Sequence, residues 1–453
     1  MARIKNAHEL GSEKIGKLLV SYSVPAITAT AAASLYNIID RVFIGQGVGP
    51  MAISGLALTY PLMNITAAFG SLVGVGAGTM VSIRLGRYDR KGATMFLGNA
   101  VMLNLVLSVS VAVTTLVFLK PILFALGASE ETYPFARDFM QVILAGNIFT
   151  HLYLGLNNIM RASGYPGKAM ITTLMTVAVN LLLAPLFIFV FDWGIRGAAF
   201  ATVVAQMTGT VWVVNHFLRA KSFVHFLPGY FKLKKLIISD IFSIGMSNFI
   251  MLLTASMVNL IMNLSLKKYG GDFAIGAFGI IVSIATLIIM IVFGFNQGMQ
   301  PIAGYNYGAK QYGRVNRVLK LTILLATGVT TSGFLLGEIF PRAIVSLFTR
   351  EEELIRIAIP ALRIVIMLFP IVGFQMVTGN FFQSIGLAGK AIFMSLARQL
   401  LFLLPGLLIL PSFLGLKGVW LSMPAADMLS SLIAAGMLIA HYKSFKKLEM
   451  TNA

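Results

Sequence analysis

Long apolar runs follow one another along almost the whole chain, and they leave few folds open to it. The hydrocarbon core of a bilayer is about 30 Å thick, so a helix that crosses it needs about 20 apolar residues. Runs of this kind, separated by charged residues or by Gly and Pro clusters, occur twelve times. They predict an all-α integral membrane protein with twelve transmembrane helices. The expected spans are residues 17–44, 52–79, 93–119, 134–160, 168–191, 195–218, 236–266, 274–301, 315–340, 355–382, 390–413 and 418–442.

Positive charges are distributed unevenly over the predicted loops. Of the 35 Lys and Arg residues, 23 fall at the termini and in every second loop, and nine fall in the opposite loops. Cytoplasmic loops carry an excess of Lys and Arg, so both termini are expected in the cytoplasm. A net charge of +19 would suggest nucleic acid for a soluble protein. Here topology explains that charge, and the expected partner is the lipid bilayer, with no nucleic acid.

The two halves of the sequence resemble each other at an offset of 222 residues. Gly76 corresponds to Gly298, and the segment 164–169 corresponds to 386–391. Each half contains an even number of predicted spans, so both halves begin on the cytoplasmic side. Such a chain forms two parallel six-helix repeats related by an axis along the membrane normal.

The repeat sets the expected domain boundaries, and a cavity between the two halves is the expected substrate site. The expected parts are a cytoplasmic N-terminal segment (1–16), an N-lobe (17–218), a cytoplasmic linker (219–235), a C-lobe (236–442) and a cytoplasmic tail (443–453).

An acidic residue, Asp40, lies near the end of the first apolar run. A carboxylate at a helix centre costs roughly 2.5–3.5 kcal/mol on insertion scales, so it suggests a functional site. Tyr36 and Asn37 precede Asp40 by four and three residues and share its helical face. Pro25, in the same run, is an expected hinge, because proline removes a backbone hydrogen bond. Alternatively, Asp40 and Arg41 cap the outer end of this helix.

Other polar residues interrupt the later apolar runs of the first half. Asn180 precedes Pro185, a second expected hinge, and Thr202 and Gln206 are four residues apart on the next helix. Asn157 ends the fourth predicted helix. Together with Asp40 these side chains suggest a site for a proton or a small cation. The alternative is hydrogen bonding between helices, which contributes well under about 2 kcal/mol per bond.

The second half has a different polar pattern. Its position equivalent to Asp40 is Met262, so the carboxylate belongs to the first half alone. Arg398 and Asp427 are both expected near the midplane of the membrane and predict a buried ion pair. This polar pair of the C-lobe serves either to stabilise the helices or to contact the substrate and gate transport.

Several kinds of chemistry are not predicted. The chain has no Cys, and its five His residues are scattered, so neither a disulfide nor a metal site is expected. The segment Gly386–Lys390 lacks the flanking residues of a phosphate-binding loop. No cofactor is expected, and active transport would be driven by an ion gradient.

The motifs taken together resemble the multidrug and toxic compound extrusion (MATE) family over nearly the whole chain. Residues 373–376 and 379–383 are similar to its MepA-like branch. The motifs that carry the resemblance are Tyr36–Gly45, Asn180 before Pro185, Gly197–Thr202 and Asn296–Pro301.

This resemblance implies drug export in exchange for H⁺ or Na⁺. Asp40, Asn180 and Thr202 match first-lobe positions that the family uses for cation binding, with Tyr36 and Asn157 beside them. Many relatives carry an Asp four residues after this Asn, where the present chain has Ala184. Some carry an Asp in the tenth helix, where the present chain has no acid. Both departures favour H⁺ coupling through Asp40 over a Na⁺ site with two carboxylates.

The expected protein is therefore a monomeric, non-enzymatic antiporter that exports small amphipathic organic cations across a bacterial or archaeal plasma membrane. A lipid-linked oligosaccharide flippase is an alternative, but it would need a strongly cationic cavity, and only Arg41, Arg363 and Arg398 lie within spans. A Na⁺-coupled exporter of anionic amphiphiles is another. A receptor would need a soluble signalling segment, and an enzyme acting in the membrane would need a catalytic pair. Neither feature is recognisable in the sequence.

Overall fold

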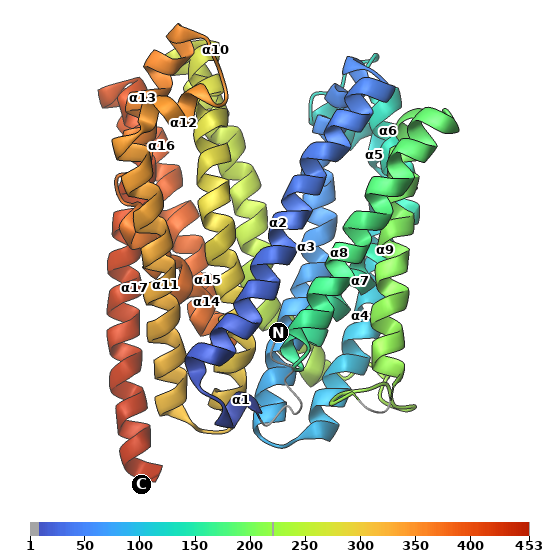
Figure 1. The fold of residues 1–453 in the computed structure, drawn as a ribbon, viewed down its shortest axis with the longest axis vertical. Helices are drawn as coiled ribbons and strands as arrows, with labels where there is room; N and C mark the ends of the chain where they lie inside the picture. The colour runs from blue at the N-terminus through green and yellow to red at the C-terminus, as the bar shows by residue number, and fades with distance from the viewer. Residues whose placement is uncertain (1–8, 220–221, 453) are drawn as a thin grey trace. The chain divides into compact units, whose positions relative to one another are not determined.

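The computed structural model describes residues 9–219 and 222–452, which form helices joined by turns and loops, with no strand among them. Within these residues, nine helices are long and apolar enough to cross a membrane, and two further spans each consist of two helices that meet at a bend. One of the nine, α10 (Lys235–Gly308), is interrupted by non-helical backbone at Gly271 and so accounts for two spans. The described residues thus contain the twelve predicted spans (Figure 1).

The helices of the two halves follow the same order. In the first half they are α1 (Glu9–Ser12), α2 (Ile15–Gly47), α3 (Pro50–Gly86), α4 (Arg90–Val117), α5 (Leu119–Ala125), α6 (Tyr133–Ala145), α7 (Asn147–Ala162), α8 (Pro166–Pro185), η1 (Leu186–Val190) and α9 (Gly194–Leu218). In the second half they are α10, α11 (Tyr312–Ile339), α12 (Pro341–Ser346), α13 (Glu352–Ile366), α14 (Phe369–Ser384), α15 (Ala388–Leu396), η2 (Ala397–Leu403), α16 (Leu404–Leu414) and α17 (Leu416–Asn452).

Glycines of the repeat occupy equivalent turns in the two halves. Gly49 and Gly271 precede corresponding helical segments with φ of 110° and 67°. Gly164 and Gly386 end the fourth and tenth spans with φ of 107° and 79°. Residues with a Cβ rarely adopt these angles, so glycine is required where the chain reverses direction. The repeat detected in the sequence is therefore a repeat of backbone turns.

Two of the predicted spans are bent. The fourth span consists of α6 and α7, which meet at 57°, and the tenth consists of α13 and α14, which meet at 50°. The apolar pattern of the sequence predicts each of them as one straight helix, so neither bend was expected. Gly146 separates α6 from α7, and a Cβ at this position would lie 2.5 Å from the side chain of Val203. The second break lies just before Pro370, whose missing N–H suits the first turn of a new helix.

The chain forms two compact units whose boundaries differ from the predicted lobes. Of the described residues, unit 1 contains 9–12 and 28–249, and unit 2 contains the segment Glu13–Ile27 and residues from 250 onwards. The start of α2 thus belongs to unit 2, and the first fifteen residues of α10, 235–249, belong to unit 1. The two exchanged segments, 13–27 and 235–249, are themselves related by the 222-residue repeat.

Close helix packing explains why segment 13–27 belongs to unit 2 and segment 235–249 to unit 1. In unit 2, a Cβ on Gly298 would lie 2.9 Å from the backbone nitrogen of Ser23. In unit 1, a Cβ on Gly76 would lie 2.1 Å from the carbonyl oxygen of Ile241. Gly76 and Gly298 are repeat equivalents, so both units use the same glycine to bring two backbones together.

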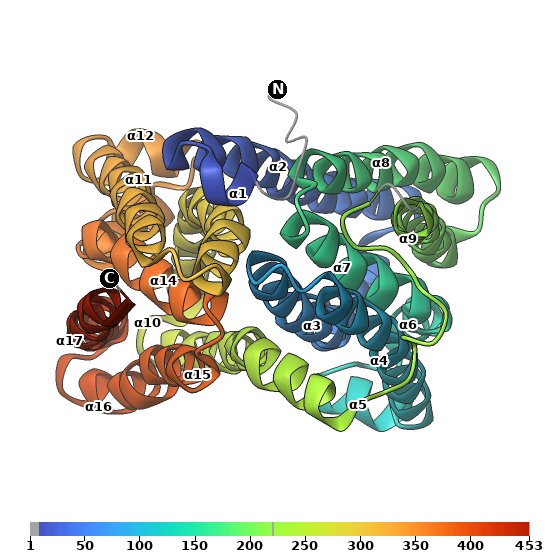
Figure 2. The same cartoon turned by 90° about the horizontal axis from the view of Figure 1, so that it is seen from below.

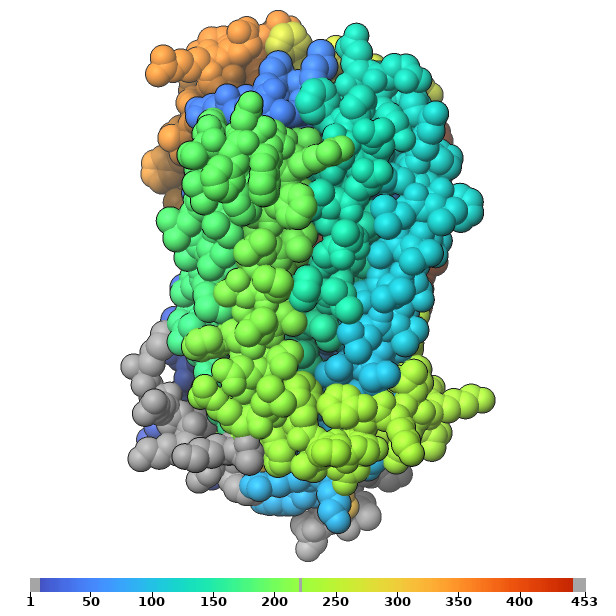
Figure 3. Space-filling model, turned by 90° about the vertical axis from the view of Figure 1, so that its right-hand side faces the viewer, coloured from blue at the N-terminus to red at the C-terminus, as the bar shows by residue number. Residues whose placement is uncertain are grey.

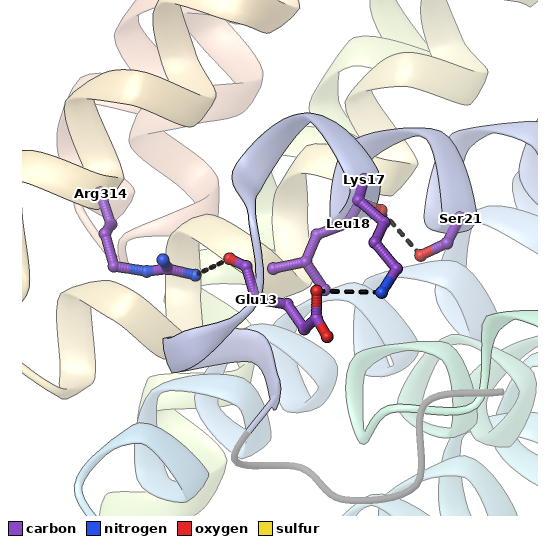
Figure 4. Close-up of polar contacts among 5 residues, drawn as sticks. All are labelled: Glu13, Lys17, Leu18, Ser21 and Arg314. Atoms are coloured by element: carbon purple, nitrogen blue, oxygen red, sulfur yellow. Dashed lines mark hydrogen bonds and ion pairs between the residues drawn. The ribbon is translucent and has the colours of Figure 1, made fainter. Parts of the chain in front are cut away.

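The beginning of α2 is also held in unit 2 by polar contacts (Figure 4). The Arg314 guanidinium on α11 donates to the Glu13 carbonyl oxygen at 2.7 Å and to the Asn306 side-chain oxygen at 2.8 Å. Lys17 pairs with the Glu13 carboxylate at 3.0 Å, one turn along the helix. Of the predicted N-terminal segment 1–16, residues 1–8 lie outside the described residues.

Each unit has its own apolar core. In unit 1, α3 packs against α4 and α7, and in unit 2, α11 packs against α14 (Figure 2). Figure 3 shows the face of unit 1 over which α9 and α4 lie. Exposed side chains on these two helices include Val109, Val113, Val211 and Trp212. Apolar side chains exposed along a transmembrane helix are those that contact lipid.

We expect Gly76→Ala to destabilise the protein, because the new methyl group would overlap the Ile241 carbonyl. Overpacking of this kind costs about 1–3 kcal/mol, so the melting temperature of the purified protein in detergent should fall by several degrees. Gly436→Ala in α17 is the control, since a Cβ there meets nothing within 4 Å. Equal melting temperatures for the two variants would contradict this account of the packing.

Candidate functional site

The polar face predicted for α2 is present, but its residues differ in burial. Asp40 is 8% exposed, and Tyr36, one turn before it, is partly buried. Asn37 is exposed and takes no part in the hydrogen bonds described below. Arg41 does not pair with Asp40; its guanidinium lies 5.6 Å from the ring centre of Tyr60. Asp40 is thus a buried carboxylate and not a cap on the helix end.

Tyr36, Asn180 and Thr202 form a closed set of hydrogen bonds from α2, α8 and α9. The Asn180 side-chain nitrogen donates to Tyr36 Oη and to Thr202 Oγ1, both at 3.1 Å. Thr202 Oγ1 donates its own proton to the Ala198 carbonyl at 3.1 Å. The Tyr36 hydroxyl, 3.3 Å from Thr202 Oγ1, is therefore the donor of the third bond. Every donor of this set is used.

Two acceptor oxygens remain without a donor. Asp40 Oδ1 and Asn180 Oδ1 are both buried and have no hydrogen-bond partner among the described residues. Leaving a buried polar atom without a partner is costly, and more so for a carboxylate. Carboxylate and amide oxygens are acceptors for a proton and ligands for hard cations. The region around α2 and α8 thus offers acceptors without the donors that would satisfy them.

Proline shapes the helix that carries Asn180. Pro185 ends α8, and the next residues form a turn of π-helix, η1, in which Phe191 donates to the Leu186 carbonyl at 3.0 Å. Proline cannot make the bond to the fourth residue before it, so a wider turn follows. Ala184, where many relatives have an Asp, is fully buried in an apolar cluster with Ile44 and Ile188. This position therefore adds no charge to the site.

The other predicted residues of unit 1 form separate contacts. Asn157 donates to Thr173 at 3.3 Å, and Tyr153 donates to the same hydroxyl at 3.1 Å. Thr150 donates to Gln206. In the described part of the chain, neither contact is joined by a hydrogen bond to Tyr36, Asn180 or Thr202. Thr173 was not among the residues predicted from the sequence, although it lies seven residues before Asn180, on the same helical face.

The structure brings the two charged residues of the C-lobe together. Arg398 Nε donates to Asp427 Oδ1 at 2.6 Å, and the Asp427 side chain is 3% exposed. Pro25 lies within α2, which continues as a helix on both sides of it. Among the described residues, no three His, Asp or Glu side chains are placed to hold a metal ion.

The fold and the buried polar set define a class: a multi-pass membrane protein built from two repeated six-helix halves, with an unpartnered carboxylate in one of them. The MatE family model matches both halves, at residues 25–186 and 248–408. The chain therefore belongs to the MatE family, the multidrug and toxic compound extrusion family, which confirms the resemblance read from the motifs.

Named relatives and solved structures agree with this assignment. The chain is 28% identical over 425 residues to the multidrug export protein MepA of Staphylococcus aureus strain MSSA476, covering 94% of this chain and 93% of the relative. A multidrug resistance MATE transporter solved in its outward-facing conformation superimposes with a TM-score of 0.91 at 23% identity, over 99% of this chain and 100% of the other. A MOP superfamily transporter from Pyrococcus furiosus, described as having a binding pocket of reverse polarity, has the same TM-score and identity over 98% and 100%.

Thr202→Val tests the hydrogen-bonded set, because valine keeps the shape of threonine and removes its hydroxyl. Tyr36 then loses its acceptor, and Asn180 loses one of its two acceptors. We therefore expect a loss of about 1–3 kcal/mol of stability, measured by thermal unfolding in detergent. Thr208→Val on the same helix is the control, since Thr208 bonds only the carbonyl of Val204 in its own helix. Equal destabilisation of both variants would show that the set contributes nothing.

Proposed function

We propose that this protein is a multidrug exporter that moves amphipathic organic cations out of the cell in exchange for protons. Family membership and the similarity to proteins named as multidrug export proteins support export. The single observation that supports proton coupling is the buried Asp40 carboxylate, which has an acceptor oxygen without a partner. A proton needs only one such acceptor, whereas a Na⁺ site needs several oxygen ligands.

The proposed cycle uses alternating access. Protonation of Asp40 from the outer side neutralises the buried charge, allows α2 to repack near Pro25, and releases the substrate. Deprotonation on the cytoplasmic side restores the carboxylate. Ala184 supports one carboxylate rather than two, because the position at which many relatives have a second acid is fully buried among apolar side chains.

The arginines within the spans do not favour a flippase for anionic lipid-linked sugars. Arg363 pairs with Glu338 at 3.4 Å, and Arg398 pairs with Asp427. Arg41 lies over the ring of Tyr60. Two of the three cations are neutralised by an acid, so the three do not form the strongly cationic cavity that a multiply charged headgroup would need.

Proteoliposomes loaded with ethidium test the proposal directly. A pH gradient, acid outside, should drive ethidium out, and a Na⁺ gradient should not. Asp40→Asn should reduce export to the level of empty vesicles, because the amide cannot exchange a proton. Asp192→Asn, a change at an exposed turn residue with φ of 55°, should leave export unchanged. Export driven by Na⁺ alone, or full activity of Asp40→Asn, would disprove proton coupling through Asp40.

We also propose that the protein is a monomer in a bacterial or archaeal plasma membrane, with both termini in the cytoplasm. The chain contains no Cys, so single cysteines can be introduced without a background signal. A membrane-impermeant maleimide added to intact cells should label Glu130→Cys and should spare Lys232→Cys until the cells are opened. The reverse pattern would invert the topology.

A further inference from the structure

Arg398 is only partly satisfied by its ion pair. A guanidinium carries five N–H donors in a planar fork. The bond to Asp427 uses the single donor on Nε, and no other hydrogen bond or ion pair of Arg398 occurs in the part of the chain that the structure describes. Both terminal amino groups are therefore unpartnered. Asp427 holds the guanidinium through Nε and leaves the edge formed by the two terminal nitrogens open.

This open edge lies deep in a membrane span. Arg398 is ten residues from the start of α15, which at 1.5 Å per residue places it about 15 Å along a span of 27 residues. Its side chain is 29% exposed, whereas Asp427 is almost fully buried. A charged donor without a partner is costly in contact with lipid tails. We expect the exposed edge to face a polar space and not the hydrocarbon.

A buried amide from the neighbouring helix lies at the same level. In unit 2, a Cβ on Gly379 of α14 would lie 3.8 Å from Cβ of Met394 on α15. The two helices are antiparallel, joined by the turn 385–387, so Gln375, one turn before Gly379, is level with Arg398, one turn after Met394. Gln375 is 5% exposed, and its Oε1 is buried without a partner. The terminal nitrogens of Arg398 and Gln375 Oε1 thus remain without hydrogen-bond partners at the same depth in unit 2.

The local helix geometry also departs from regularity at this point. Residues 397–403 form the π-helix η2, which ends just before Pro405. A proline cannot donate to the residue four positions earlier, so the preceding turn widens. Turns of π-helix within α-helices are frequent at functional sites, because they reorient the side chains they carry. Arg398 and Gln399 are two of the side chains in this turn.

We propose that Arg398, oriented by Asp427 and level with Gln375 on the neighbouring helix, binds a carboxylate group on zwitterionic or anionic substrates. A carboxylate matches the spacing of two terminal guanidinium nitrogens, and such charge-assisted bonds are roughly twice as strong as neutral ones. The Gln375 amide can turn its nitrogen towards the same group. This inference rests on the proposed export function and assigns the residue that recognises an acidic group on a substrate.

Tetramethylrhodamine, a zwitterion with one carboxylate, and its methyl ester, a cation, form a matched pair of probes. Export of each from proteoliposomes is measured for wild type and for Arg398→Gln combined with Asp427→Asn, which removes both charges and leaves no unpaired ion in the span. Loss of a charge-assisted bidentate contact should raise KM for the zwitterion about tenfold or more. KM for the ester should stay within a factor of about two.

Arg363→Gln combined with Glu338→Gln is the control, because it removes an exposed ion pair of the same unit and should change neither KM. Gln375→Leu is a milder second variant and should raise KM for the zwitterion alone, by a smaller factor. An equal change for both dyes, or none, would show that Arg398 and Asp427 only stabilise the helices. Wild type that exports only the ester overturns the inference and leaves the proposed function intact. Wild type that exports neither dye overturns both.

Discussion

The absence of water from the hydrocarbon core is the constraint on which this structure depends. Backbone groups there must bond within the chain, so the spans are helices. A buried polar side chain also needs a partner, either in its own helix, as for Asn104 and Thr322, or on a neighbouring helix. Asn180 meets this requirement by donating to Tyr36 and Thr202 from two other helices. Several buried side-chain atoms of the described residues have no hydrogen-bond partner, and Asp40 Oδ1 is the only carboxylate oxygen in this group. At Asp40 we propose that a proton completes the bonding.

Much of the fold could be predicted from the sequence, because the signals involved are local or periodic. Apolar run length gave the twelve spans, and the glycine repeat gave the two halves, whose turns at Gly49 and Gly271 have φ angles that side chains rarely adopt. The bends within the fourth and tenth spans were not predicted, since the apolar pattern continues across them. Unit membership of segments 13–27 and 235–249 was not predicted either, because it depends on the backbone contacts of Gly76 and Gly298.

The candidate site was also predicted only in part from the sequence. Residue type and helical spacing singled out Asp40, Tyr36, Asn180 and Thr202, and the last three are in mutual contact in the structure. Asn157 and Gln206, chosen by the same reasoning, contact Thr173 and Thr150 instead. A helical wheel gives the side of a helix on which a residue lies, but not which helix packs against that side. The partner of a polar side chain on another helix therefore could not be predicted from a single sequence. For this reason more polar residues were predicted for the site than the three that hydrogen-bond to one another.

The two repeats have the same backbone plan and different chemistry, and this difference bears on how the protein can work. The repeat places Met262 where the first half has Asp40, and Met262 is buried in the apolar core of unit 2. In return, unit 2 has a buried carboxylate at Asp427 that is already neutralised by Arg398 at 2.6 Å. An unpaired carboxylate can take up and release a proton as its surroundings change. The remaining N–H donors of Arg398 favour a bond to an anion. In the proposed mechanism, the two equivalent scaffolds therefore have different roles: the first takes up a proton, and the second binds an acidic group of a substrate.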